Sequence, residues 1–573
     1  MTSIPGRLPI RRQDAAALSI YVGIAAVFIA SLWLRMAFPI YAIGDAAHDD
    51  LLFVRLASYL GNGKWLGPYD NLTLAKGAFY SFFLLANQVT GLPLKLTEHI
   101  VYLLVSLYFS FAIGAVLRSR AATLACFTLL ALNPYGWVAG LGGRVVRDGL
   151  YATLSLLLLA ICVRLFVLER VLAPEADLRA KRRLLEALGL TVGAYWLTRE
   201  EGAWLVPAVL VLVVYWFLRL RHRQAAPLKA RLRQALIFLA IPAVAFCIVV
   251  GTVNAINYSK YGTFRNNDFR ASEFQAAYGA LSRIAHVQWQ PYVVFPKDAR
   301  EKAYLVSAAA RELKPFFEGT GGVNWRRPGC DHYRKQPCQE ILAGWFMWAL
   351  RDAVAHAGHY RSATAARVFY ERLQHEIDDA CDRTKLIACG PRRHSLIPPW
   401  RPEYLAATLD ASRVVVRKLI TLDDIQAANA PSPGSAEQLA LFQKVTNGPL
   451  ATHDDTHAGA DPNRITVAIA EKLTQAQVRA YAVAIPLAIL AWGVLLLVSM
   501  VRKRWHPGHI VIAALLAAIG VRVVLVSFLE ATSIPFNMLY LMPVVPMAML
   551  LLPCVFFLGV ALFKRPSVTP DLP

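Results

Sequence analysis

The chain has 573 residues and a formal net charge of +22, from 60 Lys and Arg against 38 Asp and Glu. Hydrophobic residues make up 56% and charged residues 17%, against about 25% charge in soluble domains, and mean hydropathy is +0.42. These values exclude a disordered or fibrous chain and argue against a purely soluble enzyme. The basic residues stand in short segments between apolar runs, where they indicate membrane orientation rather than nucleic-acid binding.

Ten apolar runs are typical of transmembrane helices in length and composition, although the fifth is short. The first follows three arginines but lacks a small-residue cleavage site, so we expect it to remain as an anchor. The ten predicted spans are 17–39, 98–117, 121–141, 149–167, 184–198, 203–219, 235–257, 479–501, 509–528 and 538–563.

With the N-terminus in the cytoplasm, every short basic loop falls on the cytoplasmic side, as the positive-inside rule requires. The segment 219–234 is the clearest, with six basic residues and no acid. The count works only if 77–92 is an interfacial or re-entrant helix rather than a span. The predicted fold is an α-helical polytopic membrane protein with about ten transmembrane helices and a mostly helical extracytoplasmic domain inserted before the last three. Its parts are a transmembrane module at 1–257 with the first external loop at 40–97, the inserted domain at 258–478, and the last helices with a cytoplasmic tail at 479–573.

Four of the eight cysteines lie in the inserted domain, as C-x7-C twice. This spacing fits neither a zinc ribbon nor a redox C-x-x-C motif. The simplest pairing is two local disulfides, Cys330–Cys338 and Cys381–Cys389, with the cross-pairings left open. Disulfides place the domain in an oxidising compartment, which agrees with the external position derived from the charges.

The predicted external loops carry charged residues at the membrane border. Such side chains are costly unless they are paired or used, so four charged loops on one membrane face indicate a site. The residues are Asp45, His48, Asp49, Asp50 and Lys76 in the first loop, Arg144, Arg147 and Asp148 in the second, Arg199, Glu200 and Glu201 in the third, and Glu530 in the last, with Arg522 in the apolar run before it.

Carboxylates beside cations suit the transfer of a sugar from a phosphate to a hydroxyl. Arginine forks bind phosphate oxygens, and a carboxylate takes the proton from the acceptor hydroxyl. We expect the base to be Asp49 or Asp50, with Asp45 as a base, a metal ligand or a loop residue; the acidic residues could also hold a divalent metal ion. The expected phosphate-binding residues are Lys76, Arg144, Arg147 and Arg522, with supporting roles for His48, Asp148, Arg199, Glu200, Glu201 and Glu530.

Structural roles compete with these assignments in the first two loops. Asp49 and Asp50 could cap a helix over 50–60, since aspartate favours that position. Arg144 and Arg147 could each anchor to headgroups. They stand three residues apart and would share a helical face, which favours joint phosphate binding.

The later loops and the inserted domain leave similar alternatives. Glu200 and Glu201 are expected to pair with Arg199 or Arg147 rather than to catalyse. Arg522 needs a partner, either a donor phosphate or a helix carboxylate. The aromatic residues Trp345, Phe346 and Trp348 favour core packing over a sugar-binding platform, and the glycosylation motif at Asn71 is interpreted as chance.

The first external loop resembles that of the GT-C glycosyltransferases, which include protein O-mannosyltransferases, aminoarabinose transferases and arabinofuranosyltransferases. The resemblance is carried by HDDLLFVRLASYL and GKWLGPYDNLTLAKG, and by the later segments RVVRDGLY, TREEGAWLVP and ATSIPFNMLYLMPVVP. It implies that Asp49 is the catalytic carboxylate, Asp50 its acidic neighbour and Lys76 the phosphate-side lysine. The chain departs from the family pattern before Tyr540, where Met538-Leu539 replaces the usual arginine. The resemblance covers 1–257 and 479–563 and does not explain 258–478.

The residues and the resemblance together predict a membrane glycosyltransferase. It would move a sugar from a polyprenyl-phosphate donor to a glycan, lipid or protein hydroxyl, by an inverting displacement, at the periplasmic face of a bacterial inner membrane. Its partners would be these substrates and the bilayer, with no nucleic acid. The alternatives are an O-antigen ligase or polymerase, against which the early Asp-Asp argues, a lipid or polysaccharide transporter, and an envelope scaffold. Border charges and dissimilar chain halves argue against the transporter.

Overall fold

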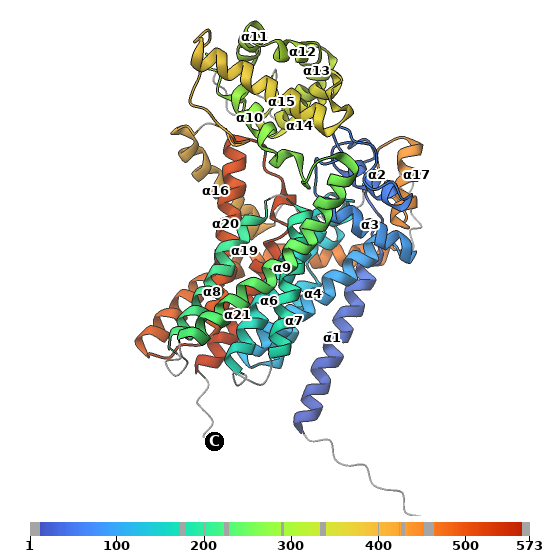
Figure 1. Cartoon of the computed structure of the whole chain (residues 1–573). Helices are drawn as coiled ribbons and strands as arrows, with labels where there is room; N and C mark the ends of the chain where they lie inside the picture. The colour runs from blue at the N-terminus through green and yellow to red at the C-terminus, as the bar shows by residue number, and fades with distance from the viewer. Residues whose placement is uncertain are drawn as a thin grey trace, which may run out of the picture.

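The computed structural model of the protein is almost entirely helical in the part of the chain that it describes. Strand-like pairing is confined there to isolated bridges, such as those joining Ile40 to Leu450 and Tyr41 to Arg144. Figure 1 shows a bundle of long helices with a smaller helical domain at one end. The described residues are 12–171, 178–199, 201–222, 228–287, 292–332, 340–398, 400–422, 425, 430–451 and 463–563.

All ten predicted spans coincide at least partly with helices of the bundle. Seven of these helices are long and apolar enough to cross a membrane: α1, α4, α6, α9, α19, α20 and α21. The ten helices are α1 (Arg12–Met36), α4 (Leu94–Leu117), α5 (Arg120–Ala131), α6 (Asp148–Val171), α7 (Leu178–Thr198), α8 (Val206–His222), α9 (Leu228–Tyr261), α19 (Arg464–Val501), α20 (Gly508–Thr532) and α21 (Val545–Phe563).

The third predicted span, 121–141, is wrong in its second half. Helix α5 ends at Ala131 after 12 residues, and two short irregular helices follow, η1 (Pro134–Trp137) and η2 (Ala139–Gly143). Asn133 precedes a proline, and a residue in that position disfavours the helical conformation. Helix α7 begins in a charged stretch and α8 has only 17 residues. The count of ten spans therefore stays a prediction.

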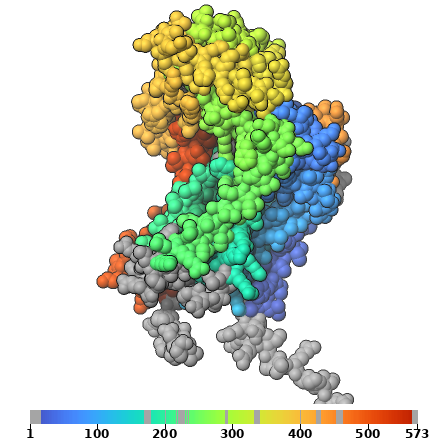
Figure 2. Space-filling view, in the orientation of Figure 1, coloured from blue at the N-terminus to red at the C-terminus, as the bar shows by residue number. Residues whose placement is uncertain are grey.

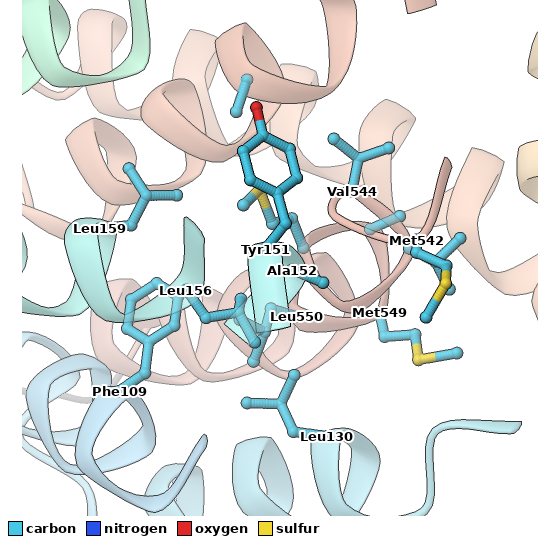
Figure 3. Packing of buried hydrophobic residues seen from close by; sticks show 14 of the residues in the cluster. Phe109, Leu130, Tyr151, Ala152, Leu156, Leu159, Met542, Val544, Met549 and Leu550 are labelled. Carbon is cyan, nitrogen blue, oxygen red and sulfur yellow. The ribbon is translucent and has the colours of Figure 1, made fainter. Parts of the chain in front are cut away.

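Helix α6 lies at the centre of the bundle. Of its apolar stretch, 89% is buried, as expected for a helix that is hydrophobic all round. Figure 3 shows Leu156 of this helix among Phe109 of α4, Leu130 of α5, and Met549 and Leu550 of α21, and all five are buried. The bundle core therefore joins helices α4, α5 and α6 directly to α21, the last described helix.

Six helices of the described residues form the outer domain and pack around their own hydrophobic core. Figures 1 and 2 show this domain at one end of the molecule. Phe274, Leu350 and Leu373 belong to this core, and so does Ala75 from the first external loop. The first loop is thus part of the outer domain's packing. The helices are α10 (Ser272–Ser282), α11 (Lys297–Val306), α12 (Ala308–Phe317), α13 (Thr320–His332), α14 (Ala343–His356) and α15 (Ala363–Asp378).

Four further helices of the described part of the chain lie between the bundle and the outer domain. Helix α16 packs against α19 and α20, and α17 packs against α2 and α3. The predicted helix at 77–92 is present as α3, and α19 runs without a break across the predicted domain boundary at 478. The predicted inserted domain therefore contains the outer domain, the helices α16 and α17, and the first part of α19. The bounds of the four helices are α2 (Asp50–Gly61), α3 (Phe79–Thr90), α16 (Glu403–Thr421) and α17 (Ala436–Thr446).

The predicted disulfide Cys381–Cys389 is present, with its Cα atoms 5.6 Å apart. The other predicted pair includes Cys338, which lies outside the described residues. The four cysteines of the apolar runs are free, as expected for small hydrophobic side chains: Cys126, Cys162, Cys247 and Cys554.

Candidate active site

Asp49 stands immediately before α2, where the first external loop becomes helical. Its side chain does not cap the helix, so the capping alternative is not what the structure shows. Both of its carboxylate oxygens face cations. Lys76 Nζ donates to Oδ1 in a short ion pair, and Arg144 Nη2 lies 3.5 Å from Oδ2.

The neighbouring Asp50 is held by Arg144 through both oxygens. Arg144 Nε lies 3.2 Å from Oδ1, and Nη2 pairs closely with Oδ2. The side chain of Asp50 is 0% exposed, whereas that of Asp49 is 44% exposed. A buried carboxylate in a bidentate ion pair cannot reach a substrate. Asp49 is therefore the accessible candidate base, and Asp50 positions Arg144.

Opposing effects set the charge state of Asp49. Burial raises the pKa of a carboxyl group, but here the positive charges of Lys76 and Arg144 outweigh it. Together with a smaller effect of Arg147 they lower the pKa of Asp49 below its ordinary value. Asp49 is ionised at neutral pH, and the ionised form is the one that can accept a proton.

Lys76 is placed by aromatic rings and by close backbone packing. Its Nζ lies 5.0 Å from the ring centroid of Phe53 and 5.6 Å from that of Trp348, within the range of cation–π attraction. A Cβ atom on the next residue, Gly77, would lie 2.0 Å from the Leu197 carbonyl oxygen at the end of α7. Glycine therefore lets the chain pass the bundle closely enough to bring Lys76 to Asp49.

Three of the four predicted phosphate-binding cations lie close enough to Asp49 to lower its pKa, whereas Arg522 pairs with another carboxylate. Arg147 approaches the same Phe53 ring to 5.9 Å, but its Nη1 donates to Thr198 O at 3.0 Å. Arg522 is 1% exposed and lies 3.0 Å from Glu201 Oε2. The partner that Arg522 requires is thus a carboxylate from the third loop.

Glu201 joins a second group of ion pairs beside the first. It lies 3.4 Å from Arg199, as the sequence predicted, and Arg199 also pairs with Asp148. Burial works to raise the pKa of Glu201, but Arg199 and Arg522 outweigh it and hold that pKa at about 2. Glu201 is therefore charged and paired, in the structural arrangement expected for this loop.

The remaining predicted residues lie apart from Asp49. Asp45 is exposed, and its side chain makes no polar contact with a described residue; Glu530 accepts a hydrogen bond from Phe536 N. Glu200 lies outside the described residues. Among those described, no three His, Cys, Asp or Glu side chains come together in a way that could hold a metal ion. The described residues around Asp49 therefore do not fit a metal ion.

The outer domain contributes residues that the sequence did not predict for the site. Asp352 of α14 accepts hydrogen bonds from Asn71 at 2.6 Å, from Trp325 at 3.0 Å and from His48 at 3.1 Å. The Trp348 ring lies 5.4 Å from that of His48. The sequence signal was the aromatic stretch of α14, for which core packing was favoured. Only the three-dimensional structure shows that α14 packs over the first external loop.

We expect Asp352→Ala to loosen the first loop. Three donors would lose their acceptor, and because they are only partly buried the cost should be about 2 kcal/mol of unfolding free energy. Hydrogen exchange of residues 65–76 should rise. Asp410→Ala serves as the control, since Asp410 is exposed and pairs only with Arg413 three residues on. Equal exchange in the two variants would contradict this account of the loop.

No protein-family model and no curated protein matches the chain. It is similar to two crystal structures of ArnT from Cupriavidus metallidurans, one in the apo state and one bound to undecaprenyl phosphate. Identity is 15% in both comparisons, with a TM-score of 0.32. The alignments cover 91% and 90% of this chain and 78% of ArnT.

Proposed function

We propose that the protein is a membrane glycosyltransferase that uses a polyprenyl-phosphate-linked sugar. The observation that carries the proposal is the environment of Asp49, a solvent-accessible carboxylate kept ionised by Lys76 and Arg144. The site joins a candidate proton acceptor to cations that favour phosphate oxygens. Its place between the bundle and the outer domain would admit a lipid-linked donor from one side and an acceptor from the other.

In the proposed reaction the acceptor oxygen attacks the anomeric carbon of the sugar. The bond from that carbon to the phosphate oxygen breaks, and prenyl phosphate leaves with the electron pair. The acceptor's proton passes to Asp49. Arg144, oriented by Asp50, and Lys76 lie beside the reacting groups and would stabilise the charge that develops on the leaving oxygen. A single displacement of this kind inverts the anomeric configuration.

We place the site on the periplasmic side of a bacterial inner membrane. The disulfide Cys381–Cys389 lies in the outer domain, and disulfides persist in oxidising compartments. The end of α8 and the start of α9, which flank the middle of the basic segment 219–234, lie at the opposite end of the bundle. The acceptor could be a glycan, a lipid or a protein.

The direct test is a transfer assay with the purified full-length chain in lipid nanodiscs. Undecaprenyl-phosphate-linked sugars are supplied with lipid, glycan and peptide acceptors, and both released undecaprenyl phosphate and glycosylated acceptor are measured. The proposal requires equal amounts of the two products. A protein that instead moves the intact lipid-linked sugar across the bilayer, without releasing undecaprenyl phosphate, would be a transporter.

The lowered pKa of Asp49 predicts how kcat/KM for sugar transfer falls at acidic pH. The base is ionised above its pKa, and activity is lost as the pH falls through it. Because Lys76 and Arg144 lower this pKa, kcat/KM should hold until the pH falls below about 3.9, the ordinary value for aspartate. In Lys76→Gln one of these cations is lost, so the limb should move to higher pH. Coincident limbs in the two proteins would show that Asp49 does not control the profile.

A further inference from the structure

A small cavity lies inside the bundle, at the ends of α1, α4, α6 and α21 that are nearest the outer domain. Its volume is about 80 Å³, several times the roughly 15 Å³ that one water requires. Apolar wall is supplied by Met542 and Pro546. The charged residues of the wall are Arg35, Lys95, Glu98 and Arg144.

Two of the three cations in this wall have a carboxylate partner. Lys95 Nζ lies 2.6 Å from Glu98 Oε2, and Arg144 pairs with Asp50. Arg35, by contrast, forms no ion pair with any carboxylate in the described part of the chain. The cavity therefore carries one positive charge in excess.

Arg35 is held in place although it lacks a counter-ion. It is 3% exposed, and its guanidinium donates to Phe38 O at 2.8 Å and Gly142 O at 3.3 Å. Gly142 belongs to the irregular segment after α5, and a Cβ there would lie 2.2 Å from the Tyr135 carbonyl oxygen. A buried arginine at a membrane border is energetically costly unless it is paired or has a functional role. Here two backbone carbonyls hold the guanidinium in place.

Tyr135 supplies an independent observation in the same wall. The residue is 2% exposed, and its hydroxyl is buried without a hydrogen-bond partner among the described residues. Buried polar groups are nearly always bonded, so a buried hydroxyl that lines a cavity and has no described partner is available to a ligand. The cavity thus combines an unpaired guanidinium with an unused hydroxyl donor.

We infer that this cavity binds the phosphate group of a lipid phosphate ester, with Arg35 and Tyr135 as its ligands. The excess positive charge selects an anion, and the guanidinium and hydroxyl both donate to phosphate oxygens. The position inside an apolar bundle favours a phosphate attached to a lipid. The inference rests on the proposed function for its role: Arg144 lines the cavity and also contacts Asp49, so the phosphate would lie one side chain from the base.

The test measures binding of undecaprenyl phosphate, without a sugar, to the full-length chain in detergent. Arg35→Gln should weaken binding tenfold or more, and Tyr135→Phe about tenfold, as expected for hydrogen bonds to a charged group. Tyr135→Phe removes an oxygen that bonds no described residue, so the fold should be kept. Tyr481→Phe is the matched control, because its hydroxyl is also buried without a described partner but does not line the cavity. It should bind as the unmodified protein does.

Three further probes identify the source of the phosphate. Undecaprenol, which lacks the phosphate, should bind weakly and equally to all variants. Competition by phosphatidylglycerol or by inorganic phosphate at the same concentration would assign the site to a bilayer headgroup or to the free anion. Unchanged binding in both Arg35→Gln and Tyr135→Phe, or equal binding of undecaprenol, would overturn the inference.

Binding and transfer can fail separately in these experiments. If the variants show the expected pattern but no sugar is transferred from any donor, the phosphate site stands and the proposed function falls. If transfer is observed and depends on Asp49 while binding ignores Arg35 and Tyr135, the inference about the cavity falls alone.

Discussion

Replacing Asp49 with asparagine should abolish sugar transfer while leaving the fold and donor binding largely intact. Asparagine keeps the size of the side chain, and one oxygen remains for Lys76 or Arg144. It cannot take the proton from the acceptor hydroxyl, and losing a general base costs about 10²–10⁴-fold in rate. The measurement is the single-turnover rate at saturating donor, with undecaprenyl phosphate affinity determined separately.

Asp45→Asn provides the matched control in the same loop. Asp45 is exposed and its side chain contacts no described polar group, so transfer should continue at a near-normal rate. If Asp45→Asn is inactive and Asp49→Asn is active, the site survives with a different base. If both variants are fully active, the proposal that this loop carries the catalytic base is wrong.

Replacing Asp50 with leucine should cause the largest loss of stability in the site. Asp50 is fully buried in a bidentate pair, and removing one partner of such a pair costs about 3–5 kcal/mol. Asp49 remains 3.5 Å from Arg144, which places the expected loss near the lower end, about 3 kcal/mol. Unfolding titrations in mixed micelles give this value.

The double variant Asp50→Leu, Arg144→Met separates stability from chemistry. Replacing both partners of a buried pair with apolar residues is often neutral or stabilising, so most of the lost stability should return. Transfer should remain impaired, because Arg144 is gone from Asp49 and from the phosphate cavity. A double variant as unstable as Asp50→Leu would mean that the pair is not the source of the loss.

Hydropathy and charge predicted the membrane class and the helical segments because both depend on local sequence. The error at 121–141 has a local cause too: the run is apolar throughout, but Asn133-Pro134 ends the helix within it. The irregular backbone that follows carries Arg144 to Asp50 and Gly142 to Arg35. Apolar composition alone could not separate a helix from this segment.

The Asp49 cluster was predictable because its residue types, carboxylates and cations at a membrane border, suggest their chemistry directly. The different roles of Asp49 and Asp50 within this cluster were not predictable. Asp49 and Asp50 are sequence neighbours, yet one is 44% exposed and the other 0%, and only the three-dimensional position of Arg144 separates them. Arg35 lies within the predicted span 17–39, where an ionisable residue indicates a functional site. Only the three-dimensional structure shows that no carboxylate of the described residues forms an ion pair with it.

The first external loop is tied to the outer domain through three backbone carbonyls just before Lys76. Asp268 N donates to Leu74 O at 2.8 Å, Asn267 Nδ2 donates to Ala75 O at 3.2 Å, and Arg351 Nε donates to Asn71 O at 2.7 Å. The outer domain is therefore not a module that evolution or an engineer could exchange without cost. Grafting a foreign domain at its boundaries would release the segment that carries Lys76. New acceptor preferences should therefore arise by changes on the surface of this domain that faces away from the first external loop, while the residues that contact the loop stay unchanged.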